Sequence, residues 1–237
     1  MRLPSLILAA GFAAASHHAQ AAPTCSIPAN LSPAPVVRPA ADEVVTGVTN
    51  AVYLLSLNWT PQWCRAGGSG ASAREMECDQ PFGFTLHGLW PNGVARPYPR
   101  FCNPVGGLDA ATVRAMFCRT PSPALLQHEW EAHGSCGWTD PKAYFAQAAR
   151  LFDRLVMPRI ETIAPDRLTA GAIRAGFVAR NRWLNAEDIY VQTTRDDALS
   201  EVRICYDLTF KPASCRGGTG APDGLRVHLA PSRSGAF

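Results

Sequence analysis

The eight cysteines of this chain constrain its fold more than any other feature. They are even in number, and all of them lie after the first 24 residues. An even set of cysteines in an exported chain indicates disulfides made in an oxidising compartment, although spacing alone fixes none of the pairs. Because no two cysteines have C-x-x-C spacing, a thiolate zinc site is not expected. The cysteines are Cys25, Cys64, Cys78, Cys102, Cys118, Cys136, Cys205 and Cys215.

Residues 1–22 have the pattern of a cleaved secretory signal peptide. Arg2 supplies a positive charge, residues 3–15 are mostly apolar, and Ala19-Gln20-Ala21 fits an A-x-A cleavage site. A membrane anchor needs about 20 apolar residues, whereas this apolar run stops at the segment SHHAQ. We therefore expect a secreted or periplasmic protein without a membrane-spanning helix.

The composition is that of a globular protein. Hydrophobic residues make up 47% and charged residues 17% of the 237 residues, which argues against a disordered chain. The formal net charge of +3 permits a polyanionic substrate without demanding one. Residues 23–45 are rich in Pro and Ala and predict an extended arm, and residues 46–237 predict a single domain.

Apolar periodicity and helix caps predict strands and helices that do not alternate strictly. This pattern favours an α+β fold over a doubly wound fold. Residues 64–78, rich in Gly and Ser between two cysteines, predict a surface loop. The expected strands are at 51–59, 188–194, 201–208 and 225–230, with another that begins at 83 and ends at His87. The expected helices run from Asp109 to Phe117, from Thr120 or Ser122 to Gly134, from Asp140 to Leu155, and from Thr169 to about Asn181.

Two short segments hold three of the four histidines that remain after the signal peptide. They are FTLHGLW, with His87, and HEWEAH, with His128 and His133. A zinc peptidase helix carries H-E-x-x-H, with its histidines four residues apart. Here they are five residues apart, about 140° around a helix, so they would converge poorly on one ion. This spacing disfavours a metallopeptidase and a metal site.

One side of that predicted helix carries residues suited to proton transfer. Residues 130–131 point elsewhere, the tryptophan into the core and the glutamate into solvent. To divide the roles of acid and base, the set needs a second imidazole from another element, and His87 is the candidate. The helix side consists of His128, Glu129, Ala132 and His133.

Both segments closely resemble the active-site segments of the ribonuclease T2 family, in the stretches FTLHGLWP and HEWEAHGSC. The resemblance extends over residues 50–216, through YLLSLNWTPQWC, AYFAQAARLFDRL and SEVRICYDLTFKPASC. It implies an exported monomer with an antiparallel sheet that cleaves single-stranded RNA without a metal or cofactor. The 2′-hydroxyl would attack the adjacent phosphorus, giving a 2′,3′-cyclic phosphate and then a 3′-phosphate, so DNA would not be a substrate. The arginine-rich composition suggests a bacterial member.

The resemblance also implies roles for residues at matching positions. His133 and His87 match the general base and general acid, and His128 matches the histidine that holds the phosphate. Glu129 matches the carboxylate that supports charge and proton placement at the phosphoryl oxygens. Four residues match base-binding positions: Trp90 and Tyr98, which would stack on a base, Asn92, in place of an aspartate that bonds the base, and Asn58, in place of a glutamine.

The family pattern also implies a set of disulfides. It pairs Cys102 with Cys136 and Cys205 with Cys215, and the spacing in bacterial relatives pairs Cys64 with Cys78. These pairs leave Cys25 with Cys118.

The chain departs from the family pattern at Ala132, where the family usually has a lysine that helps to neutralise the phosphorane. Losing one preorganised charge stabiliser costs about 2.7–4 kcal/mol. Three outcomes are open: an arginine such as Arg119 supplies the charge, the enzyme is slower, or the chain is a catalytically weakened RNA-binding or signalling member. The sequence alone predicts that Ala132→Lys raises turnover on RNA.

Overall fold

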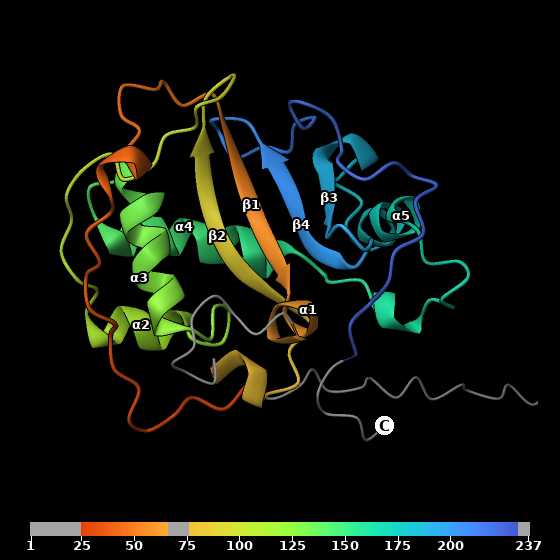
Figure 1. Ribbon diagram of the computed structural model, residues 1–237, viewed down its shortest axis with the longest axis horizontal. Helices are drawn as coiled ribbons and strands as arrows, with labels where there is room; N and C mark the ends of the chain where they lie inside the picture. The colour runs from red at the N-terminus through yellow and green to blue at the C-terminus, as the bar shows by residue number, and fades with distance from the viewer. Residues whose placement is uncertain (1–24, 66–75, 232–237) are drawn as a thin grey trace, which may run out of the picture.

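A four-stranded antiparallel sheet, in the order β2-β1-β4-β3, forms the centre of the described part of the molecule (Figure 1). The computed structural model describes residues 25–65 and 76–231. The expected signal peptide at 1–22 lies outside these ranges, as does most of the expected loop at 64–78. The strands are β1 Val52–Trp59, β2 Phe84–Asn92, β3 Ile189–Thr193 and β4 Leu199–Tyr206.

Helices pack around this sheet, which confirms the α+β fold class. Helix α4 crosses one face of the sheet, α2 and α3 lie beyond the β2 edge, and α5 lies beside β3 (Figure 1). Within the described ranges, none of the helices combines the length and apolar character needed to cross a bilayer. The α-helices are α1 Thr60–Arg65, α2 Ala110–Met116, α3 Pro123–Ala132, α4 Pro141–Arg154 and α5 Ala170–Arg180. Short 3-10 helices are η1 Ala41–Glu43, η2 Met76–Asp79, η3 Gly134–Cys136, η4 Ile160–Thr162 and η5 Ala186–Asp188.

The helices α2 to α5 begin at the caps that the sequence predicts. The side chains of Asp109, Ser122, Asp140 and Thr169 each accept a hydrogen bond from a backbone N–H in the first turn. Of the two caps considered for α3, Ser122 is the one used. Thr120 instead donates its hydroxyl to the Leu86 carbonyl at 2.7 Å, which ties β2 to the start of α3.

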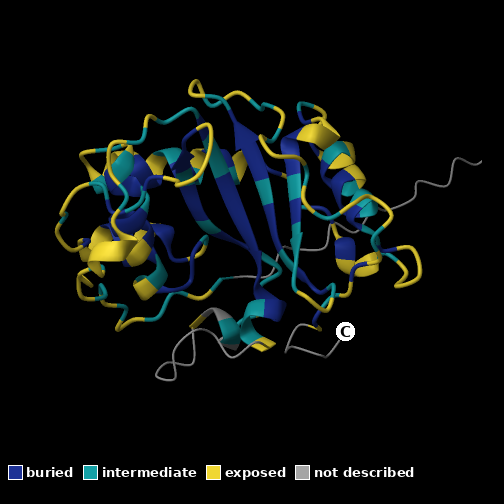
Figure 2. Ribbon diagram, turned by 45° about the horizontal axis from the view of Figure 1, so that its top comes forward, coloured by how far each residue is buried: buried dark blue, intermediate teal, exposed yellow. Residues whose placement is uncertain are grey.

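The two faces of the sheet differ in chemistry. On β1, Leu55 and Leu57 lie on the face that packs against α4 and form part of the hydrophobic core. Ser56 and Asn58 alternate with them and lie opposite Arg203 and Glu201 of β4. Directly opposed residues of antiparallel strands share a face, so these polar residues gather on the side away from α4. Figure 2 shows buried residues along the strands and exposed residues on the outer loops.

One predicted strand boundary is wrong, and one predicted strand does not form. β2 does not end at His87 but continues to Asn92. Residues 225–230 do not form a strand, because their backbone groups are divided between two elements. The Val227 N–H donates to the Leu168 carbonyl beside α5, whereas the His228 carbonyl accepts from Leu199 at the start of β4.

The predicted solvent exposure of Glu131 is also wrong. Glu131 is only 5% exposed, and its Oε1 accepts hydrogen bonds from Gln127 Nε2 at 2.6 Å and from the Val37 backbone N–H at 3.2 Å. The N-terminal segment therefore lies against this side of α3. A helical projection of α3 alone cannot anticipate this cover, because Val37 is distant in sequence.

The structure contains the four disulfides that the family resemblance implies. Cys25–Cys118 holds the start of the described chain against the end of α2, and Cys102–Cys136 joins the loop after β2 to η3. The other two bonds are Cys64–Cys78 and Cys205–Cys215. The division of the chain into an arm at 23–45 and a domain at 46–237 stays a prediction.

The spacing of the disulfides predicts how much each contributes to stability. In the chain-entropy model a disulfide stabilises more when it closes a longer loop. Cys25 and Cys118 are 93 residues apart, and Cys205 and Cys215 are 10 apart. Replacing both cysteines with serine should therefore cost about 4–5 kcal/mol in the first pair and about 2.5–3 kcal/mol in the second.

Thermal denaturation of the two double variants measures this difference, with the unaltered protein as the reference. At about 2–4 °C per kcal/mol for a chain of this size, Cys25→Ser/Cys118→Ser should have the lower melting temperature. Equal melting temperatures, or the reverse order, would show that native-state contacts outweigh loop length.

Candidate active site

A β-bulge in β2 places the His87 side chain. In the pairing with β1, Gly88 lies opposite Ser56, and the next pair is Leu86 with Leu57. His87 is thus the additional residue and has no direct partner on β1. A bulge bends the strand and redirects a side chain, and bulges are frequent next to active sites. This one lets β2 continue while His87 points towards β4 and α3.

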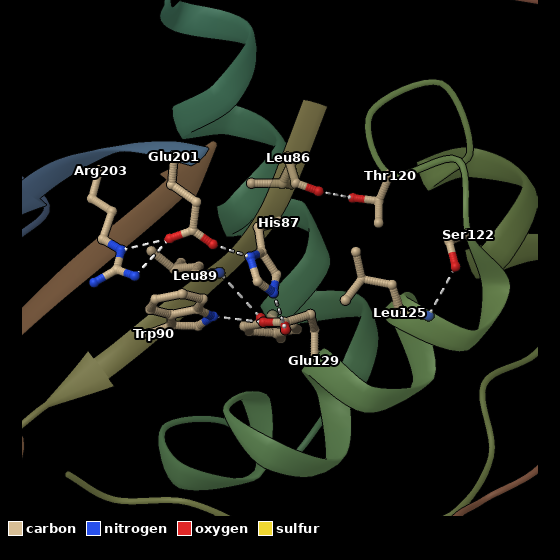
Figure 3. A network of polar contacts seen from close by, with 11 residues as sticks. Leu86, His87, Leu89, Trp90, Thr120, Ser122, Leu125, Glu129, Glu201 and Arg203 are labelled. Carbon is tan, nitrogen blue, oxygen red and sulfur yellow. Dashed lines mark hydrogen bonds and ion pairs between the residues drawn. The ribbon is translucent and has the colours of Figure 1, made fainter. Parts of the chain in front are cut away.

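His87 lies between two carboxylates that come from different elements (Figure 3). Its Nδ1 is 2.7 Å from Glu201 Oε1 on β4, and its Nε2 is 3.4 Å from Glu129 Oε1 on α3. Burial alone would lower the pKa of His87, but the charge of Glu129 and the hydrogen bond to Glu201 raise it above the usual 6.5. The raised pKa favours the imidazolium form of His87, in which Nδ1–H donates to the Glu201 carboxylate.

Glu201 is itself held in position by Arg203, two residues along β4. Arg203 donates from Nε at 2.9 Å and from Nη2 at 2.6 Å to Glu201 Oε2. Although burial opposes ionisation, His87 and Arg203 lower the pKa of Glu201 to about 2. The Arg203 guanidinium also lies 4.9 Å from the centre of the Trp90 ring. Sequence reasoning missed both residues, and the only signal was two opposite charges at alternate positions of a predicted strand.

Glu129 is buried at the base of this cluster. Its Oε2 accepts a hydrogen bond from Trp90 Nε1 at 2.7 Å, whereas its Oε1 is buried and has no hydrogen-bond partner among the described residues. Burial raises the pKa of Glu129 to about 7, against the lowering effects of His87 and Trp90. The carboxyl group can thus hold or release a proton near neutral pH.

Only a glycine fits at position 88 beside this carboxylate. A Cβ on Gly88 would lie 1.8 Å from Glu129 Oε2 and 2.9 Å from Trp90 Nε1. The close approach of β2 to α3 therefore depends on Gly88, and it brings Glu129 within reach of His87.

The sequence predicted that His133 lies within the helix, but in the structure it caps the end of α3. With φ −122° and ψ −44° it has left the helix, although its N–H still donates to the Glu129 carbonyl at 3.0 Å. Its ring is centred 5.2 Å from the Trp90 ring. Burial, followed by the charges of His87, His128 and Arg100, holds the pKa of His133 well below 6.5. His133 is therefore a neutral imidazole where His87 is charged.

His128 lies on the exposed side of α3 and close to His133. The two ring centres are 6.5 Å apart, and the Phe101 ring lies 5.8 Å from His128. Burial and the charge of Arg100 lower the pKa of His128. The structure thus brings together His87, His128, Glu129 and His133, the four residues that the sequence nominated for chemistry.

The residues predicted to bind a base lie farther apart than the four residues predicted for catalysis. Trp90 lies inside the cluster, with its ring centre 5.0 Å from that of His87 and 5.2 Å from that of His133. Asn58 is buried on β1 beside Glu201, and Asn92 is buried at the end of β2. Tyr98 lies on the loop after β2, is 36% exposed, and has Arg96 over its ring.

Two expectations about positive charge change with the structure. Arg119 does not face the cluster, because its guanidinium makes two hydrogen bonds to Asp153, at 2.8 and 2.6 Å. Ala132 is fully buried, so a lysine at this position would have to displace its neighbours. We therefore no longer expect Ala132→Lys to raise turnover.

The arrangement is suited to proton transfer by two imidazoles in opposite charge states. In the part of the chain that the structure describes, no three His, Cys, Asp or Glu side chains are grouped in a way that would hold a metal ion. Three buried polar atoms in this region, Arg100 Nε, Glu129 Oε1 and His133 Nδ1, have no hydrogen-bond partner among the described residues. Such atoms are rare in folded proteins and are consistent with a site for a polar ligand.

Comparison with known proteins agrees with these features. The model of the Ribonuclease T2 family matches residues 50–215. A protein of Haemophilus influenzae named "Probable ribonuclease" is 30% identical over 176 residues, which are 69% of this chain and 60% of that protein. The "Extracellular ribonuclease LE" of Solanum lycopersicum is 31% identical over 148 residues, which are 52% of this chain and 63% of that protein. The chain thus spans less than two thirds of the length of these relatives.

Solved structures show the same fold. Trichomaglin, described as a novel S-like ribonuclease, superposes with a TM-score of 0.60 at 19% identity, covering 76% of this chain and 98% of its own. At this identity the likeness concerns the fold alone.

The contact at Gly88 gives a test of the cluster that needs no substrate. In Gly88→Ala the new Cβ should displace the Glu129 carboxylate, break its hydrogen bond with Trp90, and destabilise the fold by about 1–3 kcal/mol. The indole N–H resonance of Trp90 should shift, and thermal denaturation should show the loss of stability.

Gly106→Ala is the matched control, because a Cβ there meets nothing within 4 Å. An unchanged Trp90 resonance in Gly88→Ala would contradict the described contact between β2 and α3.

Proposed function

Because this chain belongs to the ribonuclease T2 family, we propose that it is an endoribonuclease that cleaves single-stranded RNA by transphosphorylation. The observation that carries the proposal is the placement of two imidazoles, His87 and His133, beside the same Trp90 ring, in surroundings that shift their pKa values in opposite directions. General acid–base catalysis needs such a pair, one to accept a proton and one to give a proton.

In the proposed first step, neutral His133 accepts the proton of the ribose 2′-hydroxyl. The 2′-oxygen then forms a bond to the adjacent phosphorus, and the bond between phosphorus and the 5′-oxygen breaks. His87 gives a proton to the departing 5′-oxygen. The products are a 2′,3′-cyclic phosphate end and a free 5′-hydroxyl, with His133 charged and His87 neutral.

A slower second step restores both imidazoles. Water adds to the cyclic phosphate, giving one proton to His87, while His133 returns its proton to the 2′-oxygen. The end becomes a 3′-phosphate. DNA lacks the 2′-hydroxyl and therefore has no nucleophile for the first step.

The surroundings of His87 support its role as the acid. Since Nδ1–H is engaged by Glu201, the proton that can be transferred is the one on Nε2, on the side of Glu129. Glu201 stays ionised over the working pH range because its pKa is about 2. It thus keeps His87 charged even when Glu129 takes up a proton. We propose that Glu201 is a positioning residue.

We propose that Glu129 and His128 contact the phosphoryl oxygens. A carboxyl group with a pKa of about 7 can donate a hydrogen bond to a phosphoryl oxygen in its protonated form. His128, the residue before Glu129 on α3, is exposed. Trp90 and Tyr98 would stack on a base, and Asn92 and Asn58 would lie near it.

We propose that the protein is exported and acts as a monomer. The four disulfides support an oxidising compartment. A relative named as extracellular supports the same location. The alternative function is a weakened RNA-binding or signalling protein, and its supporting observation is the alanine at position 132.

The central experiment incubates the purified protein with homopolymer RNAs in excess EDTA and identifies the new ends. We expect cyclic phosphate and 5′-hydroxyl ends, no cleavage of the matching DNA, and a loss of about 10²–10⁴-fold in His87→Ala and in His133→Ala. His228→Ala is the control, because this histidine lies outside the cluster. RNA that is bound but left intact would favour the alternative, and cleavage that stops in EDTA would refute metal independence.

The two histidine environments also predict the dependence of kcat/KM on pH. The rate should rise as His133 loses its proton, below pH 6.5, and fall as His87 loses its proton, above pH 6.5. Glu201→Gln removes an anion beside His87 and should therefore move the falling limb to lower pH.

Glu187 is exposed, so Glu187→Gln serves as the control for the loss of a negative charge. It should leave both limbs of the pH profile unchanged. If Glu201→Gln changes only the height of the profile, Glu201 does not set the pKa of His87.

A further inference from the structure

The proposed reaction needs a cation that the residues described so far do not supply. Negative charge builds on the two nonbridging oxygens as phosphorus becomes five-coordinate. The cluster already holds two carboxyl groups, from Glu129 and Glu201, against the single positive charge of His87. The Arg203 guanidinium already donates two hydrogen bonds to Glu201.

Arg100 lies next to this cluster on a backbone fixed from three directions. Its N–H and carbonyl are both hydrogen-bonded to Val45 of the N-terminal segment, at 3.0 and 2.9 Å. The following N–H, of Phe101, donates to the Ala132 carbonyl at the end of α3 at 2.9 Å. One residue further on, the bond between Cys102 and Cys136 joins the loop to η3. Arg100 is therefore held beside the segment that carries His128 and His133.

The side chain of Arg100 forms no ion pair with a carboxylate among the described residues. Its Nε is buried without a hydrogen-bond partner, and its guanidinium lies 5.3 Å from the centre of the Phe101 ring. The same ring also neighbours His128, with the two ring centres 5.8 Å apart. An uncompensated buried guanidinium N–H is costly unless a ligand accepts from it.

The charge of Arg100 contributes to the pKa shift of each residue proposed to surround the phosphate. Burial is the largest influence on the pKa of His128, Glu129 and His133, and Arg100 lowers the pKa of all three. The direction of these shifts is the one expected of a cation near the three side chains.

We infer that Arg100 is a catalytic residue whose guanidinium binds the nonbridging phosphate oxygens and stabilises the charge that develops on them. The inference rests on the proposed function. The planar guanidinium can give two parallel hydrogen bonds to one phosphate, which suits it to this task. The cation thus comes from the loop after β2 and not from α3, where Ala132 is fully buried.

The test compares Arg100→Gln with Arg119→Gln, a matched control whose guanidinium is bound to Asp153 outside the cluster. On a dinucleotide substrate, Arg100→Gln should lower kcat by about 10²–10³-fold, Arg100→Lys should retain part of the lost rate, and Arg119→Gln should be near the unaltered protein. The rising limb of the pH profile should move to higher pH in Arg100→Gln, because a cation beside His133 is lost. Circular dichroism and melting temperature verify folding.

A second readout does not depend on cleavage. Titration with inorganic phosphate, followed through the His128 and His133 resonances, should show binding that Arg100→Gln weakens several-fold and Arg119→Gln leaves unchanged. If the unaltered protein does not cleave RNA, the proposed function fails and this titration alone decides the role of Arg100. Equal phosphate binding in both variants, or none in the unaltered protein, would overturn the inference.

Discussion

The ion pairs of His87 with Glu129 and Glu201 are the interactions on which the candidate site depends. They join β2, α3 and β4 at one side chain. Glu201 fixes the ring through Nδ1, and Arg203 fixes Glu201. Because both carboxylates come from outside the strand that carries His87, the raised pKa of His87 exists only in the folded chain. Burial, followed by the charge of His87, lowers the pKa of His133, so the acid and the base are distinguished by their surroundings.

The remainder of the fold can be understood as support for that placement. The bulge at His87 and the glycine at position 88 let β2 approach α3 closely enough for Glu129 to reach the ring. The disulfide Cys102–Cys136 and the backbone pairing of Arg100 with Val45 hold the adjoining loop against the end of α3. Burial raises the pKa of Glu129 to about 7, which is a property of the packed site and not of the residue.

The sequence was sufficient for the fold class and for the starts of α2 to α5, because helix caps are local signals. It also singled out four residues that the structure brings together, because the histidine motifs are short. It was not sufficient for Glu201 and Arg203, whose role depends on the register between β4 and β1. It also misplaced Glu131 and Arg119. The burial of Glu131 depends on Val37, which is 94 positions away in the chain. The partner of Arg119 is set by packing against α4. Long-range contacts of this kind leave no pattern in a single sequence.

The most direct test of the account is an NMR titration of the histidine ring nitrogens in the free protein. We expect a pH range near 6.5 in which His87 carries protons on both nitrogens while His133 is neutral, with the His87 Nδ1 proton shifted by its hydrogen bond to Glu201. The opposite order, with His133 retaining its proton to higher pH than His87, would contradict the assignment of acid and base and the role given to the two carboxylates.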